Sequence, residues 1–197
     1  DDGRRAPVDI KYAVDPESRN RNRIEIYQTP QIQDSDLFFE QIPALSTKGE
    51  VFVFIHGYAN AFGDAALRAA QLAQGLKNDL IPIIFTWPSN GRMGFYPQDQ
   101  ENALYSAKHL MKFLDDLSAR VAPKKINIIA HSMGAHLLTR VLTLMGVRNN
   151  QDDINRFNQV ALLAPDVDAG EFHMWAPEMR LTAQRISVYA SRNDQAL

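Results

Sequence analysis

Cysteine is absent from the 197 residues, which excludes disulfide bonds and thiolate metal sites. Charge of one sign is not in excess either, because 21 Lys and Arg face 23 Asp and Glu, for a formal net charge of −2. A nucleic-acid-binding surface needs a basic excess, so we expect no nucleic-acid partner. Apolar runs fall far short of the roughly 20 residues that span a bilayer, so we expect no transmembrane segment. The chain is expected to be soluble, and the lack of cysteine suits both the cytoplasm and export after processing.

Short apolar runs rich in β-branched residues recur along the chain and predict strands buried on both faces. They lie at residues 51–55, 81–85, 126–130, 160–164 and 186–190. Between them, apolar residues at steps of three and four predict an amphipathic helix over residues 102–121, which closes before Pro123. A second helix is expected to carry apolar residues 137–145 and to stop at Gly146.

This alternation of strands and helices predicts an α/β fold with a mostly parallel sheet and helices on both faces. Upstream, apolar residues alternate with polar ones over residues 8–14 and again at 24–26, which predicts antiparallel N-terminal edge strands. With 45% apolar residues, the chain is long enough to bury about 70% of its extended surface in one core. Residues 1–197 are therefore expected to form a single domain.

A serine lies between a predicted strand and a predicted helix, in residues 130–134 (AHSMG). A sharp turn there would expose the Ser132 hydroxyl above the edge of the sheet, and the small Ala130 and Gly134 would let the backbone turn without clashes. The N–H groups of the following helix favour developing negative charge at this point. A serine that merely caps an ordinary helix is the alternative interpretation.

A second motif, His56-Gly57, ends the predicted strand at residues 51–55. It would put a backbone N–H of Tyr58 or Ala59 near the same edge of the sheet as Ser132. Together with the N–H of Met133, such a donor would form an oxyanion hole for acyl transfer. The two motifs therefore support each other.

On these residues the sequence resembles the α/β-hydrolase superfamily, in its esterase and lipase-like part, with a nucleophile elbow at 130–134 and an oxyanion strand at 54–58. Within the superfamily it is similar to a bacterial group catalogued as a domain of unknown function. That likeness runs from about residue 50 to the end, through residues 55–58 (IHGY), 85–89 (FTWPS), 164–168 (APDVD) and 189–194 (YASRND). It implies the α/β-hydrolase fold and tells little about substrate.

A serine nucleophile needs a histidine base, and the superfamily implies the chain order serine, acid, histidine. Asp194, after the last predicted strand, is our first choice for the acid, and Asp166 is the alternative. A turn-forming role for Asp194 and a helix N-cap for Asp166 are the plain structural interpretations. Only three residues follow Asp194. We therefore expect a C-terminally incomplete domain, with the last strand, the last helix and the catalytic histidine beyond residue 197.

Five histidines lie within the sequence, and we keep only His173 as a remote substitute for the base. His56 is expected to bond to backbone, and His131 to point away from Ser132. His136 is expected to be buried beside a strand, and His109 to lie on a solvated or half-buried helix face.

The sequence thus predicts a serine-dependent hydrolase of ester-type bonds that acts on a small-molecule ester or acyl substrate through an acyl-enzyme. Ser132 would attack, Tyr58 and Met133 would hold the oxyanion, and Asp194 would orient the histidine. No metal or organic cofactor is needed, because the protein supplies every group. The chain as given is expected to have low activity. The alternatives are a non-catalytic binding module, or an amidase or thioesterase that uses the same site; the sequence predicts no oligomeric state.

Overall fold

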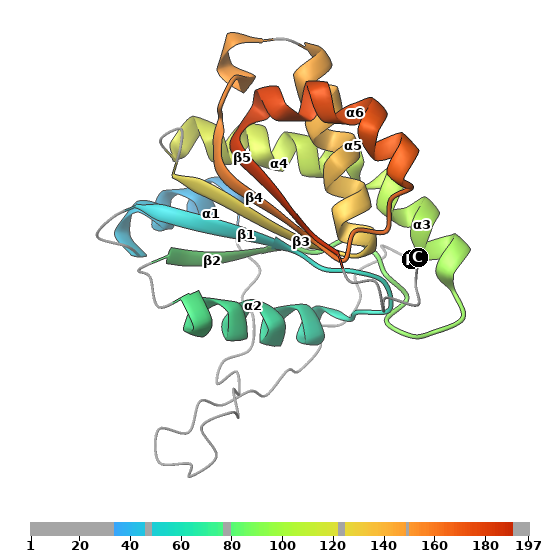
Figure 1. The fold of residues 1–197 in the computed structure, drawn as a ribbon. Coiled ribbons are helices and arrows are strands. Elements are labelled where there is room, and N and C mark those ends of the chain that lie inside the picture. The colour runs from blue at the N-terminus through green and yellow to red at the C-terminus, as the bar shows by residue number, and fades with distance from the viewer. Residues whose placement is uncertain (1–33, 46–48, 77–79, 122–124, 149, 191–197) are drawn as a thin grey trace.

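A five-stranded parallel sheet organises the protein (Figure 1), in a computed structural model that describes residues 34–45, 49–76, 80–121, 125–148 and 150–190. The strand order is β2-β1-β3-β4-β5. The five strands predicted from the sequence are confirmed: β1 (Glu50–Ile55), β2 (Leu80–Phe85), β3 (Ile126–His131), β4 (Phe157–Leu163) and β5 (Ala183–Tyr189). The predicted N-terminal edge strands at residues 8–14 and 24–26 lie outside the described residues.

Helices cover both faces of the sheet, as predicted. Figure 1 shows α2 on one face and α4, α5 and α6 on the other. The helical elements are α1 (Ser35–Gln41), η1 (Ile42–Leu45), α2 (Phe62–Leu76), α3 (Tyr96–Tyr105), α4 (Ala107–Arg120), α5 (Met133–Arg148), η2 (Gln151–Asp153) and α6 (Ala169–Thr182). None of these described helices combines the length and apolar character needed to cross a membrane.

Burial on both faces, expected for every strand, is found in β1 and not in β5. In β1, Val53 packs into the main core while Phe52 packs against α2, and both are fully buried. In β5, Arg185 and Tyr189 are exposed. The difference follows from position, because β1 lies inside the sheet whereas β5 pairs with β4 alone among the described strands.

The helix expected over residues 102–121 is two helices, α3 and α4, which meet at Ser106. The Ser106 hydroxyl donates a hydrogen bond to the carbonyl oxygen of Asn102 at 2.7 Å, and this type of bond bends helices. The apolar periodicity continues across the break, since Ala103 and Ala107 are both buried. Periodicity alone therefore predicted one helix.

Gly146 does not end its helix, contrary to the sequence prediction, because α5 continues to Arg148. A Cβ atom at Gly146 would overlap the carbonyl oxygen of Glu178 in α6. The glycine is thus required for the close approach of α5 and α6, not for a left-handed turn.

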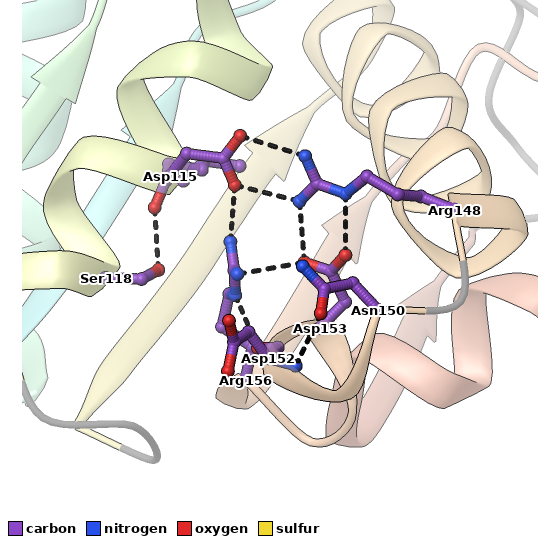
Figure 2. Close-up of polar contacts among 8 residues, drawn as sticks. Asp115, Ser118, Arg148, Asn150, Asp152, Asp153 and Arg156 are labelled. Atoms are coloured by element: carbon purple, nitrogen blue, oxygen red, sulfur yellow. Dashed lines mark hydrogen bonds and ion pairs between the residues drawn. The ribbon is translucent and has the colours of Figure 1, made fainter.

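A network of ion pairs joins α4, α5 and the start of β4 (Figure 2). Arg148 donates to both carboxylate oxygens of Asp153 at 2.7 and 2.8 Å, and to those of Asp115 at 3.1 and 3.0 Å. Arg156 donates to Asp115 at 2.5 Å and to Asp153 at 3.0 Å. Asp153 and Arg156 are almost fully buried. The network lies at the opposite end of α5 from Ser132, so it fastens the scaffold away from the candidate site.

Candidate active site

Ser132 forms the turn between β3 and α5 and has a φ of +50°. A positive φ is costly for a residue with a side chain and persists only where surrounding contacts enforce it. Here the Ser132 N–H donates to the carbonyl oxygen of Leu163 in β4 at 2.9 Å, and the Ser132 carbonyl accepts from the N–H of Ala135 at 2.8 Å. The strained serine turn that the motif predicted is therefore present and held from both sides.

Two glycines let the end of β1 approach this turn closely. A Cβ atom at Gly57 would lie 2.8 Å from Nδ1 of His131 and 2.9 Å from Cβ of Ser132. A Cβ atom at Gly134 would overlap the carbonyl oxygen of His56. The structure thus brings together the two motifs that the sequence suggested would cooperate.

Residues 57–60 follow β1 and include the two candidate oxyanion donors, the N–H groups of Tyr58 and Ala59. Ala59 has a φ of +55°. The side-chain amide of Asn60 donates to the carbonyl oxygen of Tyr58 at 2.7 Å. The N–H of Tyr58 stays our candidate donor for the oxyanion hole, and the N–H of Ala59 stays the alternative. Met133, the other expected donor, opens α5, where the first N–H groups have no partner within the helix.

His56 is buried and both of its ring nitrogens are engaged. Nδ1 lies 3.0 Å from the Gly57 carbonyl oxygen, so it donates, and Nε2 accepts from the N–H of Trp87 at 3.3 Å. The ring also stacks on Trp87 with a centroid distance of 5.0 Å. Burial lowers the pKa of His56, which favours the neutral ring. The expected bond to backbone is confirmed, and His56 is not available as a base for Ser132.

A cleft of about 710 Å³ lies beside the serine turn, and its walls come from α5, the β4–α6 loop, α6 and β5. The N–H of Asp166, a residue of this wall, donates to the carbonyl oxygen of Ser132 at 3.4 Å. Six of the twelve lining residues are apolar, among them Pro165, Phe172 and Val188, and the other six are polar or titratable. The cleft therefore offers apolar contact surface together with carboxylate and imidazole groups.

Asp166, the alternative acid, is bound to Tyr96. The Tyr96 hydroxyl donates to Oδ2 of Asp166 at 2.5 Å, and partial burial together with this bond raises the pKa of Tyr96 to about 12. The N-cap role considered for Asp166 belongs instead to Asp168, which accepts from the N–H groups of Gly170 and Glu171 at the start of α6. Asp194, the preferred acid, lies outside the described residues.

The remaining histidines have different surroundings. His131 is exposed and borders a hollow on the α2 face of the sheet, and His109 is exposed on α4. His136 is half-buried rather than buried, stacks on Trp175 and lines the cleft, as does the exposed His173. Among the residues that the structure describes, no group of three or more His, Asp or Glu side chains is arranged to hold a metal ion.

Sequence reasoning missed Asn60, which ties down the loop after β1, and Asp99, which binds Ser89 and Asn90 in the loop after β2. An acid in the first turn of a helix is ordinarily a solvated residue that interacts with the helix dipole. The one feature of the sequence that could have pointed to Asp99 is the nearby segment at 85–89, because its Ser89 hydroxyl donates to Asp99 at 2.6 Å.

The parallel sheet, its helical layers and the serine turn define an α/β-hydrolase fold. The model of a family described as "alpha/beta hydrolase of unknown function (DUF900)" matches residues 36–197, and the chain belongs to this family. The superfamily and the group that the sequence resembles are thus confirmed.

One curated relative, the uncharacterized protein alr1448 of Nostoc sp., is 36% identical over 58 residues, which are 29% of this chain and 15% of that protein. Two solved structures are more distant. RedJ, a thioesterase from the prodiginine biosynthetic pathway in Streptomyces coelicolor, is 18% identical with a TM-score of 0.39 and covers 58% of this chain and 39% of its own. An esterase from Pyrobaculum calidifontis is 17% identical with a TM-score of 0.38, over 75% of this chain and 50% of its own. The chain spans at most half the length of these three proteins.

Proposed function

We propose that the protein is a serine hydrolase of ester-type bonds that works through an acyl-enzyme. The observation that carries the proposal is the strained Ser132 turn, with a φ of +50° at the start of α5 and in close contact with the loop after β1. Backbone strain of this kind concentrates at functional sites, because ordinary turns have no need of it. The cleft beside the turn, with apolar surface and a few polar groups, supports a small-molecule ester or acyl substrate.

In the proposed reaction the Ser132 hydroxyl gives its proton to a histidine as Oγ bonds to the carbonyl carbon. The carbonyl oxygen becomes an oxyanion, which the N–H groups of Tyr58 and Met133 stabilise. The intermediate collapses, the bond to the leaving alcohol breaks, and the alcohol takes the proton from the histidine. Water then repeats the sequence on the acyl-enzyme and releases the acid.

The acid in this proposal is Asp194, with Asp166 as the alternative, and its role is to orient the histidine. We assign the base to a histidine that follows the acid in the full-length protein. Within the described residues, we keep His173 as the substitute; it lines the cleft, as His136 also does. His56 is ruled out by the bonds at both ring nitrogens.

A fluorophosphonate probe, which reacts with activated serines, tests the proposal. We expect the full-length protein to be labelled and to hydrolyse p-nitrophenyl butyrate, and Ser132→Ala to abolish both. Ser118→Ala is the matched control, because Ser118 lies on α4 and its hydroxyl is bonded to the Leu114 carbonyl oxygen at 2.6 Å. Labelling that survives in Ser132→Ala would defeat the proposal. For residues 1–197 alone we expect slow or absent labelling, and strong labelling there would favour His173 as the base.

A further inference from the structure

Asn60 has a half-buried side chain that the proposed reaction leaves without a role. It lies in the loop between β1 and α2, two residues after Tyr58. Its amide nitrogen Nδ2 donates to the carbonyl oxygen of Tyr58 at 2.7 Å and, over a longer distance of 3.4 Å, to that of Gly57. Both partners are carbonyl oxygens, so the part of the side chain that faces them must be its NH₂ group. One amide thus binds two consecutive carbonyl groups.

The Gly57 carbonyl has a second donor, the His56 ring. Nε2 of this ring accepts from the N–H of Trp87, which leaves the proton on Nδ1, and Nδ1 donates to the Gly57 carbonyl oxygen at 3.0 Å. Gly57 itself lies against the serine turn, since a Cβ atom there would be 2.9 Å from Cβ of Ser132. The peptide between Gly57 and Tyr58 is therefore fixed in direction and close to Ser132.

These bonds determine where two backbone N–H groups point. In a planar trans peptide the N–H is antiparallel to the carbonyl of the preceding residue. The Gly57 carbonyl shares its peptide with the N–H of Tyr58, and the Tyr58 carbonyl shares its peptide with the N–H of Ala59. Because both carbonyls point at Nδ2 of Asn60, both N–H groups point away from it. Ala59 has a φ of +55°, and consecutive N–H groups next to such a left-handed residue form a concavity that binds anions.

The Tyr58 side chain is fixed at its far end as well. Its hydroxyl accepts from the N–H groups of Gly94 and Phe95 at 2.7 and 3.2 Å. Both residues lie in the loop that precedes α3, so the loop after β1 is fastened to its neighbour. With its ring held there and its peptides held by Asn60, Tyr58 has little freedom to turn its own N–H.

We propose that Asn60 is a positioning residue, whose amide holds the Gly57 and Tyr58 carbonyls so that the N–H groups of Tyr58 and Ala59 face the oxyanion formed on the substrate of Ser132. The inference rests on the proposed function and deepens it, because one side chain then orients both candidate donors. Asn60 acts through the two peptides and does not touch the substrate. An aspartate in its place would turn an acceptor toward the two carbonyl oxygens and repel them.

The test uses Asn60→Asp and Asn60→Ala in the full-length protein, with p-nitrophenyl butyrate as the substrate. Loss of one oxyanion donor reduces kcat by about a hundredfold or more, so displaced donors should reduce kcat by roughly ten- to a hundredfold in Asn60→Asp. Asn60→Ala should lose less, because His56 still holds the Gly57 carbonyl. KM should stay within about twofold, because the hole acts in the transition state. Binding of a trifluoromethyl ketone with a butyryl chain, whose adduct carries an oxyanion, should weaken in proportion to kcat.

Asn127→Asp is the matched control. The half-buried Asn127 side chain also donates to a backbone carbonyl oxygen, that of Val51 at 3.2 Å. It lies at the start of β3, whereas Ser132 follows the end of that strand. Urea unfolding should show a comparable loss of stability in Asn127→Asp and Asn60→Asp, but kcat of the control should stay within about twofold of the unmodified protein. If Asn60→Asp fails to fold, Asn60→Ala decides.

Nitrogen-15 relaxation of the Tyr58 and Ala59 amides gives a readout that does not depend on activity. We expect order parameters of about 0.85, typical of a rigid backbone, in the unmodified protein and in Asn127→Asp, and lower values in both Asn60 variants. Unchanged order parameters, or a folded Asn60→Asp with unaltered kcat, would overturn the inference. A rise in KM with constant kcat would also overturn it, because Asn60 would then shape the substrate cleft. If the unmodified full-length protein shows no Ser132-dependent turnover, the proposed function fails, and the order parameters then decide alone whether Asn60 holds the two peptides.

Discussion

Gly134 packs directly on the backbone of His56, so closely that a Cβ atom would overlap the His56 carbonyl oxygen and lie 2.8 Å from that of Ile55. The contact joins the first turn of α5 to the end of β1. It is the reason that the serine motif requires glycine at its last position, and it sets the distance between Ser132 and the loop after β1.

Gly134→Ala should therefore both destabilise the protein and impair the site. Overpacking a rigid backbone contact costs about 1–3 kcal/mol, and the forced separation would move Ser132 away from the Tyr58 N–H. Urea unfolding measures the loss of stability, and kcat for p-nitrophenyl butyrate in the full-length protein measures the effect on the site.

Gly75→Ala in α2 is the control, because nothing lies within 4 Å of its added Cβ. Alanine there should raise the free energy of unfolding by about 0.5 kcal/mol and leave kcat unchanged. Equal behaviour of the two variants would contradict the argument.

The sequence predicted the strands and the serine turn because their signals are local. Parallel strands that are buried appear as short continuous apolar runs, and each of the five runs is a strand. The serine turn depends on neighbours within a few positions, so Ser132, Ala130 and Gly134 could be recognised together.

Features that depend on packing between distant segments were not predictable. The close crossing at Gly146 requires knowledge that α6 passes over it at Glu178. The burial of Asp99 requires that the loop after β2 folds back onto the first turn of α3. The break at Ser106 leaves the apolar spacing intact, so the pattern carries no trace of it.

Asp153→Asn should destabilise the fold without changing the chemistry. Asp153 binds Arg148 and Arg156, and Arg156 is only 7% exposed, so loss of this carboxylate leaves the buried Arg156 with Asp115 as its remaining carboxylate partner. Removal of one partner of a buried ion pair costs about 3 kcal/mol or more. Urea unfolding should show this loss, with kcat unaltered at temperatures where the variant stays folded.

Asp116→Asn is the control, because it breaks the exposed pair with Lys112 and should cost less than about 0.5 kcal/mol. A comparably small loss in Asp153→Asn would show that the network is not stabilising.

Asp115 should make the stability fall in acid. Burial alone would raise the pKa of Asp115, but hydrogen bonds from Arg148 and Arg156 outweigh it and lower the pKa below the ordinary 3.8. The ionised form therefore stabilises the fold fully above that value, and the stabilisation is lost as the pH falls through the lower pKa of the folded protein. Asp115→Asn should be less stable near neutral pH and should lose less stability between about pH 5 and about pH 3. Urea unfolding across this range measures both slopes. A remaining slope is expected from Asp99, whose pKa is lowered as well; identical slopes in both proteins would contradict the assignment.

The two candidate acids can be separated by their response to the amide substitution. Oδ2 of Asp166 already accepts the Tyr96 hydroxyl at 2.5 Å, so this carboxylate is less free to orient a histidine. In the full-length protein we expect Asp194→Asn to lower kcat by about 10⁴-fold, the effect of an amide that orients the wrong histidine tautomer. Asp166→Asn should lower it by less than about tenfold, because an amide oxygen can still accept from Tyr96. Tyr96→Phe, which removes the bond and keeps the ring, should match Asp166→Asn closely. If the large loss instead follows Asp166→Asn, Asp166 is the acid, and Tyr96→Phe should then change kcat differently from Asp166→Asn because the carboxylate remains.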